Sequence, residues 1–260
     1  MCLIIFGYQV NQDYPLVLAA NRDEFFPRPT QQAQFWTPSG SRNTILAGKD
    51  LQAGGTWLGI TRGGRFAAVT NIRDPAEAEG KPCSRGALTL NFLESEVSAA
   101  DYCGALAERY DDFASYNLLL ADGAAMYYVN NFERSYWPLE SGIYGLSNGL
   151  LNTPWPKVEQ GRVMLEDLLN NPANLDTDAL IAMMSSREPA IDTELPDTGV
   201  SKELERLLSS AFIANTQRQY GTRCSTGLLL GKRTIKFAEQ NFDAESNPST
   251  GHYFEFERVS

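Results

Sequence analysis

The alternation of hydrophobic and polar positions along the chain predicts a series of β-strands before the first helix. Residues 2–10 form an almost unbroken apolar run, which is typical of a buried strand. Residues 14–20 form a second apolar run, and the turn Asn11-Gln12-Asp13 between the two predicts a hairpin. Further strand-like runs, separated by glycine pairs and an Asp-Gly turn, occupy residues 56–61, 65–70, 116–121, 124–129 and 143–146.

Helical periodicity appears later in the chain, at residues 98–114, after Pro156, and at residues 177–186 and 201–213. The chain then closes with three predicted strands, at residues 224–230, 234–240 and 253–259. Runs of strands and runs of helices, rather than strict alternation, indicate an α+β fold. Since no internal repeat or linker interrupts the order, we expect a single domain over residues 1–260.

Composition narrows the classes of partner. Hydrophobic residues make up 43% and charged residues 21%, which is ordinary for a globular protein with a core, and the formal net charge is -10. That charge opposes extended contact with phosphate backbones, so we expect no nucleic-acid partner. The absence of a long apolar run predicts no integral membrane insertion.

The cysteines and the single histidine exclude further chemistry. Four cysteines form no CxxC pair, and the first residues do not resemble a signal peptide, so we expect a reduced, cytoplasmic setting. His252 is the only histidine, which excludes a multi-histidine metal site, and we expect no metal. The sequence leaves the oligomeric state open.

Cys2 is the residue best suited to carry chemistry. Removal of Met1, which aminopeptidases catalyse when a small side chain follows, would leave a thiol and a free α-amine on one residue. The amine, with an ordinary pKa of about 7.7–8.0, can act as general base for its own thiol. The alternative interpretation is that Cys2 is a small core residue at the start of a strand.

Several motifs, in order along nearly the whole chain, resemble those of one family, the NRDE or transport-and-Golgi-organisation family. They are Met1-Cys2, the Asn-Arg-Asp-Glu run at residues 21–24, and residues 54–59, 70–75, 147–148 and 220–223. The family is similar to the N-terminal-nucleophile hydrolases, with penicillin V acylases and bile salt hydrolases as enzymatic relatives. The resemblance therefore implies a four-layer αββα sandwich with two stacked antiparallel sheets.

The resemblance also implies roles for individual residues. Cys2 matches the nucleophile, Arg22 and Asp23 match the pair that orients it, and Arg223 matches a late arginine. Asn71 and Asn148 match asparagines whose amides would stabilise an oxyanion, where one donor typically contributes ~3 kcal/mol. Alternatively, the two asparagines only cap turns.

One departure from the acylases concerns the charged pair. Arg22 and Asp23 are adjacent here, and adjacent residues on a strand point to opposite faces. Either a bulge follows Asn21, or only one of the two charges reaches Cys2. We favour Asp23 beside the amine, with Arg22 and Glu24 as alternative buried structural partners.

Two functions follow. In the first, the protein is a thiol hydrolase that cleaves an amide or thioester of a small acyl substrate through Cys2 and requires no cofactor. In the second, the protein keeps this fold but has lost catalytic turnover. It then functions in haem trafficking or binds an acyl lipid or coenzyme A, as the resemblance also implies. For haem, the sequence offers few axial ligands, chiefly Cys2 and His252, so we expect weak binding.

Overall fold

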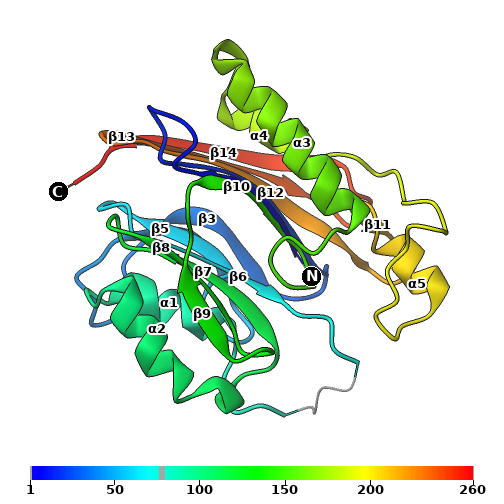
Figure 1. Cartoon of the computed structure of the whole chain (residues 1–260), viewed down its shortest axis with the longest axis horizontal. Helices are drawn as coiled ribbons and strands as arrows, with labels where there is room; N and C mark the ends of the chain where they lie inside the picture. The colour runs from blue at the N-terminus through cyan, green and yellow to red at the C-terminus, as the bar shows by residue number, and fades with distance from the viewer. Residues whose placement is uncertain (1, 76–79, 260) are drawn as a thin grey trace. The chain divides into compact units, whose positions relative to one another are not determined.

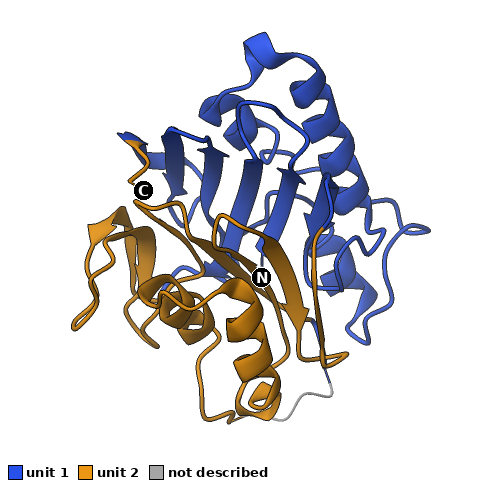
Figure 2. Ribbon diagram, turned by 60° about the vertical axis from the view of Figure 1, so that its left-hand side comes forward, with its two compact units in different colours: residues 1–27, 73–75, 140–256 blue, residues 28–72, 76–139, 257–260 orange. Residues whose placement is uncertain are grey.

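The computed structural model describes residues 2–75 and 80–259, which form two compact units (Figure 1; Figure 2). Unit 1 comprises the described parts of residues 1–27, 73–75 and 140–256, and unit 2 those of residues 28–72, 76–139 and 257–260. Each unit is therefore assembled from separated stretches of chain, and the single domain over residues 1–260 stays a prediction. Met1, whose removal belongs to the predicted chemistry, lies outside the described residues.

Unit 1 is built on an antiparallel sheet with the strand order β10-β1-β2-β12-β13-β14, to which β11 is added beside β12. Its strands are β1 (Cys2–Tyr8), β2 (Leu16–Phe25), β10 (Gly142–Leu146), β11 (Ala214–Asn215), β12 (Tyr220–Leu230), β13 (Thr234–Phe242) and β14 (Pro248–Glu257). The predicted hairpin is confirmed: β1 and β2 pair from Cys2↔Arg22 to Tyr8↔Leu16. β2 continues beyond the predicted end at residue 20, so that the Asn-Arg-Asp-Glu run lies within a strand.

Two helices, α3 (Pro156–Asn170) and α4 (Thr177–Ala182), cover one face of this sheet (Figure 1). α3 begins with Pro156 at its first position, as predicted, because the fixed φ of proline suits that position and its missing N–H is not needed there. The core between helices and sheet contains alternate residues of β1 and β2, together with residues of α3 and α4: Leu3, Ile5, Val17, Ala19, Val158, Leu165 and Leu180. Odd-numbered residues of β1 and β2 therefore face the helices, and even-numbered residues face away from them.

The helix predicted over residues 201–213 was too long, because α5 (Lys202–Leu207) ends six residues earlier. Beyond its end, the Ser209 hydroxyl donates to the carbonyl of Arg206 at 2.7 Å, and the Ser210 hydroxyl donates to that of Phe212 at 2.8 Å. Serine side chains that bond to nearby backbone in this way compete with helical hydrogen bonding. The segment that follows therefore leaves the helix and forms β11.

Unit 2 contains a second antiparallel sheet, whose strands lie side by side in sequence order from β3 to β9. These strands are β3 (Thr30–Trp36), β4 (Ile45–Asp50), β5 (Leu58–Thr61), β6 (Phe66–Asn71), β7 (Tyr116–Ala121), β8 (Met126–Asn130) and β9 (Ser135–Pro138). Helices α1 (Gly86–Glu94) and α2 (Ala99–Ala107) pack against it over a core that includes Ala67, Leu88, Phe92 and Leu118. The helix predicted over residues 98–114 was also too long, since a short 3-10 turn at Tyr110–Asp112 follows α2.

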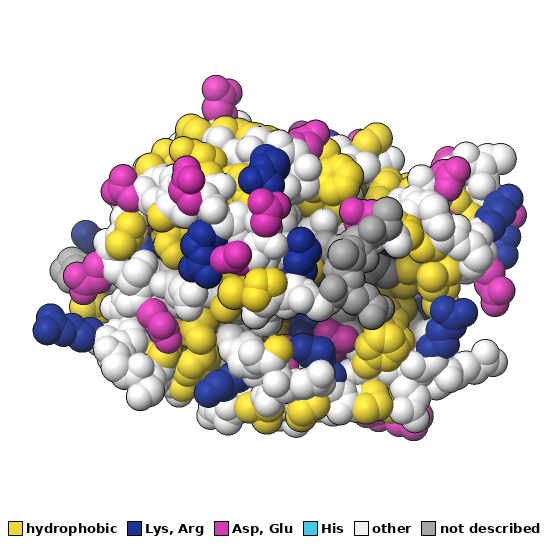
Figure 3. All heavy atoms as spheres, turned by 90° about the horizontal axis from the view of Figure 1, so that it is seen from below, with side chains coloured by type: hydrophobic (Ala, Val, Ile, Leu, Met, Phe, Trp, Pro, Cys, Tyr) yellow, Lys and Arg dark blue, Asp and Glu magenta, His cyan; other side chains and the backbone are white. Residues whose placement is uncertain are grey.

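The surface carries both signs of charge. On the face drawn in Figure 3, acidic and basic side chains are interspersed. Within the described part of the chain, no helix combines the length and the apolar character needed to cross a membrane.

Candidate functional site

Cys2 opens β1 and lies between two neighbouring strands of the unit 1 sheet. On one side its register partner in β2 is Arg22, so the two side chains share the sheet face that points away from α3 and α4. On the other side, the Ser147 hydroxyl, just beyond β10, donates to the Cys2 carbonyl at 3.2 Å. The cysteine side chain is half-buried.

Arg22 and Asp23 are adjacent on β2, and the bulge near them lies on a different strand, β12. β2 pairs with β1 in unbroken register past Asn21, so no bulge follows that residue. The irregularity lies between Thr222 and Cys224 of β12, where Arg223 is the extra residue. Asp23 thus lies opposite Thr222 on the helix-facing side, whereas Arg22 lies between Cys2 and Cys224 on the other side.

Both charges of the pair nevertheless act on the thiol. Desolvation raises the pKa of Cys2, the negative charge of Asp23 raises it further, and the guanidinium of Arg22 lowers it. Cys2 is the first residue of its strand, so charges on both faces of the sheet influence it there. The pairing therefore places Arg22, and not Asp23, on the sheet face of the Cys2 side chain, while the charges of both residues shift the pKa of the thiol.

Asp23 is buried, with an exposed fraction of 1%. Its carboxylate accepts a hydrogen bond from the Thr222 hydroxyl at 2.7 Å, and that hydroxyl accepts one from the Ile213 amide at 2.9 Å. The Tyr220 hydroxyl donates to the Asp23 carbonyl at 3.3 Å. Burial raises the pKa of Asp23, whereas the positive charge of Lys157 and the bond from Thr222 lower it.

Lys157 is a member of the site that the sequence reasoning missed. It follows Pro156 in the first turn of α3, it is 4% exposed, and its ammonium donates to the Leu208 carbonyl at 2.8 Å. Burial lowers the pKa of Lys157 to about 8, against the raising effects of Asp23 and Cys2. The sequence did contain a sign of its role, because a lysine in the first turn of a helix lies at the positive end of the helix dipole, where a cation is unfavourable without a compensating partner.

A buried ion pair joins Arg73 to Glu205 of α5. The Arg73 guanidinium lies 2.5 Å from the Glu205 carboxylate, which also accepts hydrogen bonds from the backbone amide and hydroxyl of Thr198. The guanidinium lies 5.1 Å from the centre of the Trp155 ring. Glu205 was also missed, because its partner is 132 residues away in sequence.

The two predicted oxyanion donors fall in different units. Asn148 is buried in unit 1, and its carbonyl accepts a hydrogen bond from the Arg73 amide at 2.8 Å. Continuing the β1–β10 register beyond Ile4↔Leu146 brings Asn148 level with Cys2. Asn71 ends β6 in unit 2 and is half-buried.

Arg223 holds the end of β2. Its guanidinium donates to the carbonyls of Phe25 and Phe26, at 2.9 and 3.1 Å, and lies 5.4 Å from the centre of the Phe26 ring. Desolvation and the charge of Arg22 lower its pKa. Cys2, Arg22, Asp23 and Arg223 therefore lie on neighbouring strands of one unit, and Asn148 lies just beyond β10 in the same unit.

The remaining member of the Asn-Arg-Asp-Glu run, Asn21, makes structural hydrogen bonds. Its amide donates to the carbonyls of Met184 and Ala211, at 2.8 and 2.9 Å, and its side-chain oxygen accepts from Ser225 at 2.6 Å. These bonds tie β2 to the segments after α4 and α5 and to β12. The run therefore combines a structural residue with two charges around the thiol.

Comparison with known sequences identifies the family. The sequence profile described as Transport and Golgi organisation 2 (TANGO2) matches residues 1–244. The chain belongs to the TANGO2 family. It is 36% identical to the Transport and Golgi organization protein 2 homolog of Bos taurus and 34% identical to that of Homo sapiens, each over 248 residues that cover 88% of both chains.

Among solved structures, this TANGO2 family member is similar to the mutant C2A conjugated bile acid hydrolase of Clostridium perfringens. The TM-score is 0.53 at 9% identity, and the match covers 98% of this chain and 92% of that one. The predicted fold class is confirmed: two antiparallel sheets with helices in an N-terminal-nucleophile-hydrolase-like fold. At this identity the similarity shows the fold alone.

Proposed function

We propose that this TANGO2 family member is a thiol hydrolase that cleaves an amide or thioester of a small acyl substrate. Cys2 would be its nucleophile once Met1 has been removed. The observation that carries the proposal is the position of Cys2 at the start of β1, level with Arg22 and under the influence of buried Asp23. A reduced cytoplasmic setting, which we also propose, would keep the thiol available.

In this mechanism the α-amine of Cys2 accepts the thiol proton, and the sulfur forms a bond to the substrate carbonyl carbon. The carbonyl electrons move to oxygen, where the amide of Asn148 would donate a hydrogen bond. The protonated amine then gives its proton to the leaving nitrogen or sulfur, and an acyl thioester on Cys2 remains. Water, deprotonated by the same amine, hydrolyses that thioester.

The charged residues would set the protonation states. Arg22, opposite Cys2, lowers the pKa of the thiol and so favours the thiolate. Asp23 would hold the protonated α-amine, with Thr222 fixing the orientation of its carboxylate. Arg223 would act through the end of β2, and the role of Asn71 rests on the family resemblance.

A turnover assay tests this function. We expect the purified protein to hydrolyse short acyl thioesters or N-acyl amides, and Cys2→Ala to reduce the rate on the order of 10²-fold or more. Cys83→Ser is the matched control, since Cys83 is also a half-buried free cysteine but belongs to unit 2. Equal hydrolysis by wild type and Cys2→Ala would contradict the proposal.

The second candidate is binding without turnover, and the raised pKa of Cys2 favours it, because burial disfavours the reactive thiolate. Haem held by two axial ligands does not fit. Cys2 lies on β1 and His252 on β14, four strand spacings apart in the sheet, or about 19 Å. A haem titration of wild type and Cys2→Ala tests ligation by the thiol alone, and identical Soret spectra would exclude it.

A further inference from the structure

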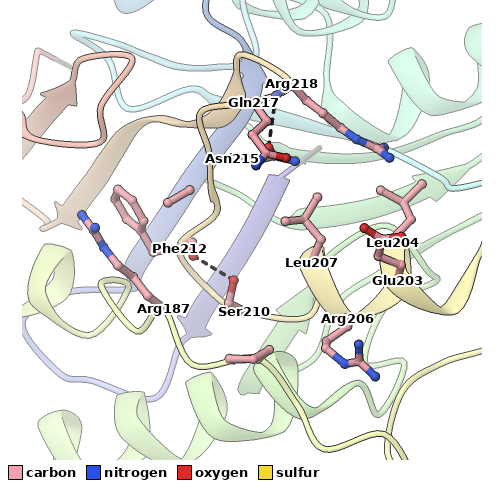
Figure 4. A pocket seen from close by; sticks show the side chains of 12 residues that line it. Arg187, Glu203, Leu204, Arg206, Leu207, Ser210, Phe212, Asn215, Gln217 and Arg218 are labelled. Atoms are coloured by element: carbon pink, nitrogen blue, oxygen red, sulfur yellow. Dashed lines mark hydrogen bonds between the residues drawn. The ribbon is translucent and has the colours of Figure 1, made fainter.

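A concave region of unit 1 shares none of the residues discussed around Cys2. It is a cavity of about 450 Å³, bounded by α5, by β11 and by the turn that joins β11 to β12 (Figure 4). A volume of this size lies in the range of small-molecule sites. All the residues that line it belong to unit 1.

Part of the lining is apolar. Leu204 and Leu207 of α5 and the ring of Phe212 contribute to it. Phe212 is 2% exposed and packs edge-on against Phe242, with ring centres 4.8 Å apart. This surface can bury the hydrocarbon part of a ligand.

Arginines supply the polar part, and they differ in how they are held. Arg206 makes two-pronged contact with Asp192, at 2.5 and 2.7 Å, so its charge is compensated. Arg187 donates to the Ser246 carbonyl at 2.7 Å and lies 4.6 Å from the centre of the Phe212 ring, which fixes its guanidinium without neutralising it.

Arg218 is the most available of these cations. Its backbone amide donates to the Asn215 side chain at 3.1 Å, and among the described residues its guanidinium has no hydrogen bond or ion pair. Figure 4 shows Arg187 and Arg218 on opposite sides of the pocket. Glu203 is the one acidic residue in the described lining. A pocket with a positive balance in a chain of net charge -10 favours anions.

We propose that this pocket binds a small amphiphilic anion, a molecule with an apolar body and one carboxylate or phosphate group. The apolar body would lie against Leu204, Leu207 and Phe212, and the anionic group would pair with Arg218, while the charge of Arg187 adds to the positive balance of the pocket. The proposal goes beyond the hydrolase function, because it requires no turnover at Cys2.

Calorimetric titration with four probes tests the proposal. Octanoate and octyl phosphate carry both features, 1-octanol carries only the apolar body, and inorganic phosphate carries only the charge. We expect 1-octanol and inorganic phosphate to bind at least about tenfold more weakly than the better of the two amphiphilic anions. The order of octanoate and octyl phosphate identifies the anionic group.

Two variants locate the site. Arg218→Gln keeps the backbone bond to Asn215 and should weaken binding of the better anion about fivefold, whereas Arg233→Gln removes an exposed arginine elsewhere in unit 1 and should not change it. Backbone amides over residues 204–218 should exchange hydrogen more slowly when the anion is bound. Absence of binding by both amphiphilic anions, or equal affinity in wild type and Arg218→Gln, would overturn the proposal.

Discussion

At the scale of single residues, the site is a set of buried charges whose partners are distant in sequence. Arg22 and Asp23 could be identified from their motif beside a candidate nucleophile. Thr222, which orients Asp23, became evident only from the pairing of β2 with β12. Lys157 was missed for the same reason, because nothing near Pro156 indicates which carboxylate its ammonium would face. Sequence reasoning therefore found the charged residues nearest Cys2 but not Thr222 and Lys157, which stabilise the charge of Asp23.

Lys157 should make stability depend on pH in the alkaline range. Its pKa is about 8 in the folded protein and 10.5 ordinarily, so between these values the unfolded chain binds more protons. The free energy of unfolding should therefore rise with pH across that window, by roughly 3 kcal/mol from this group alone. Below pH 8 both states carry the charge, and the full cost of burying it remains.

Urea denaturation of wild type and Lys157→Met at pH 7.5, 9 and 10 measures this effect. Methionine keeps much of the side-chain volume and cannot titrate. Tyrosines and cysteines that also ionise in this range are present in both proteins, so their contribution cancels in the difference between them. We expect the difference, wild type minus variant, to increase with pH. A difference that is constant over this range would show that the ammonium is not held at a lowered pKa.

At the scale of elements, strands with strong apolar patterns were predictable and polar or uncapped elements were not. β7 matches its predicted residues 116–121, whereas β3 was missed because polar residues interrupt its sequence. α1 was missed because it lacks a start signal: no side chain caps its first turn. β4 was also missed, because it contains Gly48, and glycine usually interrupts a strand. Gly48 lies against the Trp57 ring, and a Cβ atom at this position would come within 2.2 Å of a ring carbon.

The glycine pair before β5 offers a matched test of such backbone constraints. Gly54 and Gly55 both have φ near +75°, at +73° and +79°, where any other residue is strained. A Cβ on Gly54 would meet nothing within 4 Å, whereas one on Gly55 would lie 2.3 Å from the Gly86 carbonyl oxygen. Gly54→Ala should cost about 1 kcal/mol of unfolding free energy, and Gly55→Ala at least twice that. Equal losses in urea denaturation would contradict this packing of α1 against residue 55.

At the scale of the whole molecule, the order of strand and helix runs was sufficient for the α+β class, and the ordered motifs were sufficient for the family and its fold. The pattern could not predict that the sheet of unit 1 draws on both ends of the chain, with β2 flanked by β1 and β12. This pairing brings residue 2 within two strands of residue 224. It is the reason that Cys2 lies among buried charges, and it is consistent with the proposed role of Cys2 as nucleophile.

The intact mass of the protein, purified from its own cells and acid-quenched after brief reaction with an octanoyl thioester, tests that assignment most directly. We predict a chain that lacks Met1 and carries one octanoyl group, with the added group absent from Cys2→Ala. A chain that retains Met1 and gains no acyl group would contradict the N-terminal-nucleophile mechanism.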